Sequence, residues 1–76
     1  MVEKTSEKVK SANEATEIAL SFVKKHRWSF ARPLKAIKED GTWLVEIDVG
    51  PVLVKMAKIK IDARSGDILE YNIPGD

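Results

Sequence analysis

Few residues in this chain of 76 are of the types that perform chemistry. The only histidine, His26, stands in a basic run at residues 24–27, and no carboxylate lies near it in the sequence. Cationic side chains at the end of a helix stabilise the negative end of the helix dipole. We therefore expect His26 to be structural or solvated, rather than a general base or a metal ligand.

Glu46 and Asp48 are the two carboxylates whose spacing suits acid–base chemistry. Two residues apart in a strand, they point to the same face, as a cooperating acid and base must. That face also receives lysines from the next predicted strand, so cross-strand salt pairing is the favoured role for both. The chain has no cysteine and no glycine-rich phosphate loop or nucleophile motif. We expect no enzymatic activity, no cofactor and no metal site.

A basic and aromatic segment is the candidate for nucleic-acid binding. Trp28 and Phe30 alternate with Arg27 and Arg32, next to two lysines, and stacking beside cations is one way to hold single strands. The net charge is only +1, with 13 basic and 12 acidic residues, whereas nucleic-acid-binding domains normally have a strong basic excess. We interpret the segment as a helix end followed by aromatics at the edge of the core, and expect no nucleic-acid partner.

The first element that must position these residues is a helix beginning near Ser11. Ser11 and Glu14 fit a capping box, and one apolar stripe follows at helical spacing: Ala12, Ala15, Ile18, Ala19, Phe22 and Val23. We predict a flexible lead-in at residues 1–10, a single α+β domain at 11–73 and a short tail at 74–76. No apolar run is long enough to cross a membrane, so no membrane insertion is expected.

The remainder predicts a three- to four-stranded antiparallel meander, with the helix packed on one of its faces. Strands are expected at residues 34–39, 42–49, 52–62 and 68–73. The apolar alternation of the third segment changes phase near residues 55–57, which indicates either a β-bulge there or a loop in its early part.

The turn between the last two strands predicts their register. With Gly66 in a left-handed conformation in a three-residue loop, Ile61 lies opposite Leu69 and Ile59 opposite Tyr71, while Lys60 pairs with Glu70 on the other face. A slip of one residue would exchange the two faces.

The face of the sheet away from the helix is the candidate partner surface. It is expected to carry Ile37, Leu44 and Ile68 among charged residues, and a contiguous apolar group there would be an association site. A two-residue turn at Asp40-Gly41 places Ile37 opposite Leu44 on this face, whereas a longer turn moves Ile37 into the core beside Trp43.

Three segments resemble the PepSY family of domains: the helix at Glu14–Leu20, the strand at Gly41–Ile47 and the closing hairpin at Ile59–Leu69. The resemblance covers roughly residues 12 to 72. It implies a non-catalytic fold that inhibits or binds other proteins, often in protease propeptides or at the cell envelope. A fainter similarity, over Trp43–Ile47 and Asp62–Tyr71, is to a gas-vesicle accessory family.

Taken together, the residues indicate a small non-enzymatic binding or regulatory module with a protein partner or a second copy of itself. The alternative is a structural or assembly protein that homodimerises through the open sheet face. As the sequence stands we expect a cytoplasmic protein, or an extracytoplasmic one if an export signal was trimmed. The charged fraction of 33%, dominated by Lys and Glu, is common in proteins of thermophiles.

Overall fold

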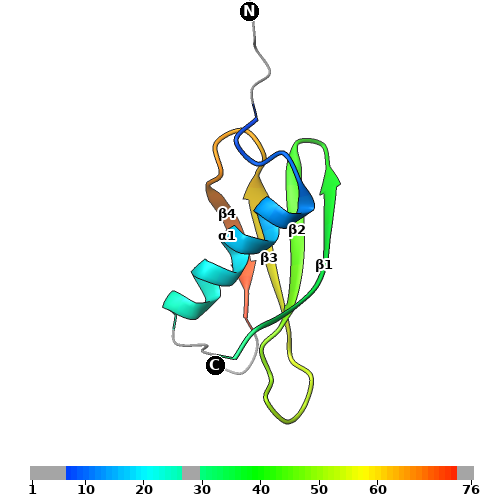
Figure 1. The fold of residues 1–76 in the computed structure, drawn as a ribbon, viewed down its shortest axis with the longest axis vertical. Coiled ribbons are helices and arrows are strands. Elements are labelled where there is room, and N and C mark those ends of the chain that lie inside the picture. The colour runs from blue at the N-terminus through cyan, green and yellow to red at the C-terminus, as the bar shows by residue number, and fades with distance from the viewer. Residues whose placement is uncertain (1–6, 27–29, 74–76) are drawn as a thin grey trace, which may run out of the picture.

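One N-terminal helix packs against a four-stranded antiparallel meander, in a computed structural model that describes residues 7–26 and 30–73 (Figure 1). The strand order in the sheet follows the chain, β1-β2-β3-β4. The elements are α1 (Ala12–Lys25), β1 (Arg32–Glu39), β2 (Thr42–Asp48), β3 (Met56–Asp62) and β4 (Ile68–Asn72). The predicted α+β class and its layering are confirmed.

Helix α1 begins where the sequence predicts. The Glu14 N–H donates to Ser11 Oγ at 3.2 Å, while the Glu14 carboxylate accepts from the N–H of Lys10 at 2.6 Å, one residue earlier than in a standard capping box. The residues that the helix buries against the sheet are Ala15, Ala19 and Val23. Two of these are alanines, and such small side chains let the helix axis approach the strands closely.

The central strands supply the other half of the core. Every second residue of β2 and β3 is buried on the face that α1 covers, as the alternation predicts. These residues are Trp43, Val45, Ile47, Ala57, Ile59 and Ile61.

The third strand is shorter than its apolar composition indicates. β3 begins at Met56, so the early part of the predicted strand is a loop, one of the two alternatives left open. At the other end of the sheet, β1 begins at Arg32 and includes Pro33, beside which the pairing shifts register. β1 is an edge strand, where proline and an irregularity are tolerated.

The last hairpin differs from the prediction by one residue. Ile59 pairs with Tyr71 and Lys60 with Glu70, as predicted, but Ile61 pairs with Ile68 instead of Leu69. The turn has four residues instead of three, because the backbone pairs of Asp62 close it: Gly66 N–H to Asp62 O at 2.8 Å and Asp62 N–H to Asp67 O at 2.9 Å. A register shift within β4 then restores the predicted pairs.

The segment before the helix is packed rather than free. Val9 is buried, its N–H donates to the carbonyl of Ala63 at 3.0 Å, and its own carbonyl accepts from the indole N–H of Trp43 at 2.9 Å. The predicted flexible lead-in is therefore wrong for residues 7–10. Residues 1–6 and the predicted tail, 74–76, lie outside the described part of the chain.

Candidate docking surface

The open sheet face holds two of the three residues predicted for it. Asp40 and Gly41 form a two-residue turn with φ values of 51° and 75°, which places Ile37 directly opposite Leu44. Ile68 is not on this face, because the register shift directs it against the core. Its predicted position on the open face is therefore wrong, for the same reason that the predicted register of the last hairpin differs by one residue.

Leu69 takes the place of Ile68 on the open face. It borders a shallow hollow together with Leu44, and Lys60 and Glu70 line the same hollow. The Lys60 ammonium and the Glu70 carboxylate are 3.4 Å apart. The apolar residues of this face are therefore mixed with an ion pair.

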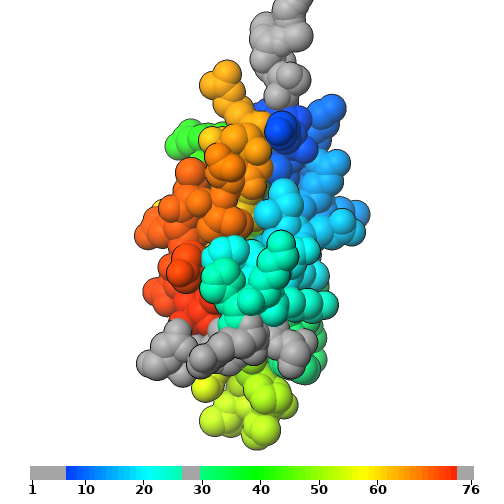
Figure 2. Space-filling view, turned by 90° about the vertical axis from the view of Figure 1, so that its left-hand side faces the viewer, coloured from blue at the N-terminus to red at the C-terminus, as the bar shows by residue number. Residues whose placement is uncertain are grey.

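A more exposed apolar group lies in the loop between β2 and β3, residues 49–55. Val52, Leu53 and Val54 are 90%, 73% and 70% exposed. The loop extends past the end of the sheet in Figure 1, and Figure 2 shows it, yellow-green, as a protrusion at one end of the molecule. Single exposed apolar residues are ordinary, but a run of three at a protruding tip is normally avoided unless it has a function. We call Val52–Val54 the apolar tip.

The base of this loop is held by a buried carboxylate. Asp48, the last residue of β2, is 1% exposed, and its Oδ1 accepts from the N–H of Gly50 at 3.0 Å and of Lys55 at 3.1 Å. Its Oδ2 accepts from the guanidinium of Arg32 at 3.1 Å. The N–H of Val49 donates to the carbonyl of Lys55 at 2.9 Å and closes the base. The two ends of the loop are thus tied together independently of the tip.

These contacts keep Asp48 ionised. The N–H groups of Gly50 and Lys55, followed by the Arg32 side chain, lower the pKa of Asp48 below its ordinary value of 3.8, although burial acts in the opposite direction. The buried charge is compensated by hydrogen bonds and an ion pair, as burial of a carboxylate requires. Asp48 therefore acts as a structural residue of the loop, with both of its carboxylate oxygens engaged in hydrogen bonds.

The other residues that the sequence singled out for chemistry are Glu46 and His26. Glu46 has Lys35 and Lys58 as its cross-strand neighbours in the sheet, so its salt-paired role stays a prediction, whereas Asp48 is paired with Arg32 of β1 rather than with a lysine of β3. The Nδ1 of His26 lies 2.9 Å from the carbonyl of Phe22, at the end of the helix.

The basic and aromatic segment is only partly described. Arg27 and Trp28 lie outside the described residues, and the Arg32 guanidinium is 5.9 Å from the centre of the Phe30 ring. Because Arg32 also binds Asp48, its charge is already engaged within the fold.

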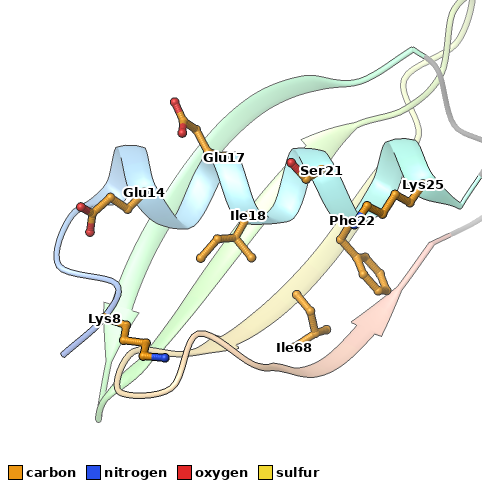
Figure 3. Close-up of a pocket in the computed structure, with 8 residues that line it drawn as sticks. All are labelled: Lys8, Glu14, Glu17, Ile18, Ser21, Phe22, Lys25 and Ile68. Carbon is orange, nitrogen blue, oxygen red and sulfur yellow. The ribbon is translucent and has the colours of Figure 1, made fainter.

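A second hollow, of about 620 Å³, lies between α1 and β4. In Figure 3 the side chains of Ile18 and Phe22 point from the helix toward Ile68 of β4 and form an apolar floor. Charged residues stand around it: Glu14, Glu17 and Lys25 from the helix and Lys8 from the segment before it. We call this hollow the helix groove.

Within residues 7–26 and 30–73, no cluster of three or more His, Cys, Asp or Glu side chains is arranged to hold a metal ion. The described helix is too short and too polar to span a bilayer.

Comparison with known protein families, characterised proteins and solved structures gives no match to this chain. The resemblance to PepSY domains therefore stays a hypothesis based on three short segments.

The sequence left Val52–Val54 open between a bulged strand and a loop, so it did not identify them as an exposed surface. Val52 to Val54 have strong β propensity, and the phase change in the third segment was the signal of a loop. Gly50-Pro51 before the tip and Lys55 after it delimit a run that pairs with no strand.

Proposed function

We propose that this protein is a small non-enzymatic binding module, PepSY-like in fold, that docks through the apolar tip of its β2–β3 loop. The observation that supports this function is the exposure of three consecutive aliphatic side chains, because contiguous exposed apolar groups mark interaction sites.

The anchoring of the loop adds a second argument. Asp48 and Arg32 hold the base of the loop. The loop therefore loses less conformational entropy when a partner immobilises the tip. A docking element of this kind needs no catalytic residues.

The experiment that tests this function places a photoactivatable benzoylphenylalanine at position 53, and at position 69 in a control protein. Leu53 and Leu69 are both exposed leucines, but only Leu53 belongs to the tip. We expect irradiation in cells to give discrete protein adducts from position 53 and few from position 69. Adducts from position 69 alone, or from neither position, would refute docking through the tip.

Homodimerisation through the open sheet face is the second candidate, supported by the direct pairing of Ile37 with Leu44. It predicts that Leu44→Glu changes a dimer into a monomer in sedimentation velocity, and that substitutions in the tip leave the dimer intact.

A further inference from the structure

The apolar tip protrudes from the molecule, whereas the helix groove is an open hollow with an apolar floor. The tip is a convex protrusion without a hydrogen-bonding side chain between Pro51 and Val54. The helix groove is concave, and its floor is made by Ile18, Phe22 and Ile68. A partner that received the tip would need such a floor, and this chain itself carries one.

The charge beside the tip is opposite in sign to the charge of the two carboxylates that line one end of the groove. Lys55 follows the tip directly, and the nearest acidic residue in the loop, Asp48, is buried and paired with Arg32. The loop therefore presents positive charge beside its apolar tip. The carboxylates of Glu14 and Glu17 line the groove from the N-terminal half of α1, whereas Lys25 lies at the C-terminal end of the helix and Lys8 in the segment before it.

We propose that the occupant of the helix groove is the apolar tip of a second copy of this chain. In this arrangement Leu53 lies over Ile18 and Phe22 of the neighbour, and Lys55 lies toward Glu14 and Glu17. The inference rests on the proposed function, since it names the partner of the same loop.

The contact is heterologous, because the tip and the groove are different surfaces of the molecule. Each copy keeps one free tip and one free groove, so such contacts produce rings or open chains of molecules rather than closed dimers. A symmetric contact between two tips is disfavoured, because it would bring Lys55 of each copy together without an exposed carboxylate in either loop. A contact of one loop and one groove is small, and we expect weak, transient association.

Two variants that each remove one half of the contact give the test. Leu53→Asp disables the tip and leaves the groove intact. Ser21→Arg fills the groove from an exposed position on α1 and leaves the tip intact. Sedimentation velocity of the wild-type protein, up to millimolar concentration, should show species larger than a dimer. We expect each variant alone to be monomeric, with association weakened about tenfold or more.

The mixture of the two variants is the decisive sample. An equimolar mixture has one working tip and one working groove, so it should form a 1:1 dimer and nothing larger. The matched control Leu69→Asp, also an exposed leucine, should assemble like the wild-type protein. Lys55→Glu should weaken association about two- to fivefold, and adding Glu17→Lys should restore it. Circular dichroism melts check that each variant is folded.

Three outcomes would overturn the inference: a monomeric wild-type protein, assembly that survives Leu53→Asp, or a variant mixture that stays monomeric. The position-53 cross-linking experiment separates this failure from that of the proposed function. Adducts to a different protein keep the tip as a docking element and exclude the second copy, whereas the absence of adducts removes both.

Discussion

The β2–β3 loop and the β3–β4 turn are held by the same kind of hydrogen bond. The β2–β3 loop exposes apolar side chains, whereas the β3–β4 turn exposes polar ones. In each, an aspartate at the end of a strand accepts the N–H two residues later: Asp48 from Gly50 at 3.0 Å and Asp62 from Arg64 at 3.0 Å. This is the hydrogen bond of an Asx turn. The two connections therefore reverse the chain by the same local chemistry.

Their tips differ in what they contribute to the fold. In the β3–β4 turn, Ser65 donates to Asp62 at 3.2 Å and accepts from the N–H of Asp67 at 3.2 Å, so a polar side chain completes the turn. The side chains of the apolar tip make no such bond and are largely exposed. Val52–Val54 are therefore not needed to shape their loop, which is why we assign them to a partner.

The largest expected effect is at the glycine of each connection. A Cβ at Gly50 would overlap the carbonyl oxygen of Leu53 and lie 3.0 Å from the N of Lys55, so Gly50→Ala must displace backbone and should cost about 3 kcal/mol. At Gly66 the nearest atom to an added Cβ is Val9 Cγ2, at 3.7 Å, and the strain comes from φ of +81°. Gly66→Ala should therefore cost about 1–2 kcal/mol. Urea unfolding of both variants checks the order, and equal losses would contradict the packed loop base.

Replacing each aspartate by alanine should show that the buried Asp48 contributes more to stability than Asp62 does. Asp62→Ala loses two exposed turn bonds, from the Arg64 N–H and the Ser65 hydroxyl, and should cost about 1–2 kcal/mol. Asp48→Ala leaves the N–H groups of Gly50 and Lys55 without their acceptor and Arg32 without its partner, so its loss should be clearly larger. The measurement is the free energy of unfolding of each variant. A smaller loss for Asp48→Ala would show that the loop base is solvated.

Acid should act on the β2–β3 loop through Asp48. Its pKa in the folded protein is lower than its ordinary value of 3.8. The ionised form therefore adds stability above about pH 4, and this contribution is lost as the pH falls from 3.8 through the lower folded value. In urea unfolding between pH 2 and 6, the midpoint concentration should decrease within this window, and Asp48→Asn should make that part of the profile flatter. An equally steep profile for the variant would assign the acid sensitivity to other carboxylates.

The smallest expected effect on folding is at the apolar tip. Leu53→Ser removes a side chain that is 73% exposed, and the free energy of unfolding should change by no more than about 0.5 kcal/mol. The same substitution should reduce association in sedimentation velocity. A loss of stability comparable to that of Gly50→Ala would mean that the tip is packed against the fold and is not a docking element.

Local patterns predicted most of the architecture because they depend on near neighbours in the chain. The cap at Ser11 and the alternation from Trp43 to Ile47 require only the helical and strand periods. The Asp40-Gly41 pair predicts the hairpin itself, although not the turn length that decides whether Ile37 faces Leu44. None of these inferences required knowledge of what packs on the other side.

The candidate site was beyond such reasoning, because its placement depends on contacts between distant residues. Val52–Val54 have the composition of a strand, and they project as a loop because Asp48 binds Lys55 and Arg32 at the base. The backbone hydrogen bonds of Asp62, rather than the composition of β4, place Leu69 instead of Ile68 on the open face. The segment at Val9 is ordered by the indole of Trp43 and the carbonyl of Ala63.

The sequence by itself therefore determined the helix, the alternation of the central strands, the position but not the register of the first hairpin, and the absence of a recognisable catalytic motif. Periodicity and turn chemistry are local, and an interval of a few residues is enough to express them. The tertiary structure decided which apolar residues are left exposed, where the last hairpin shifts its register, and that the tip and the helix groove occur in one molecule. Those outcomes depend on burial and hydrogen bonds between residues far apart in the chain, which no local pattern records.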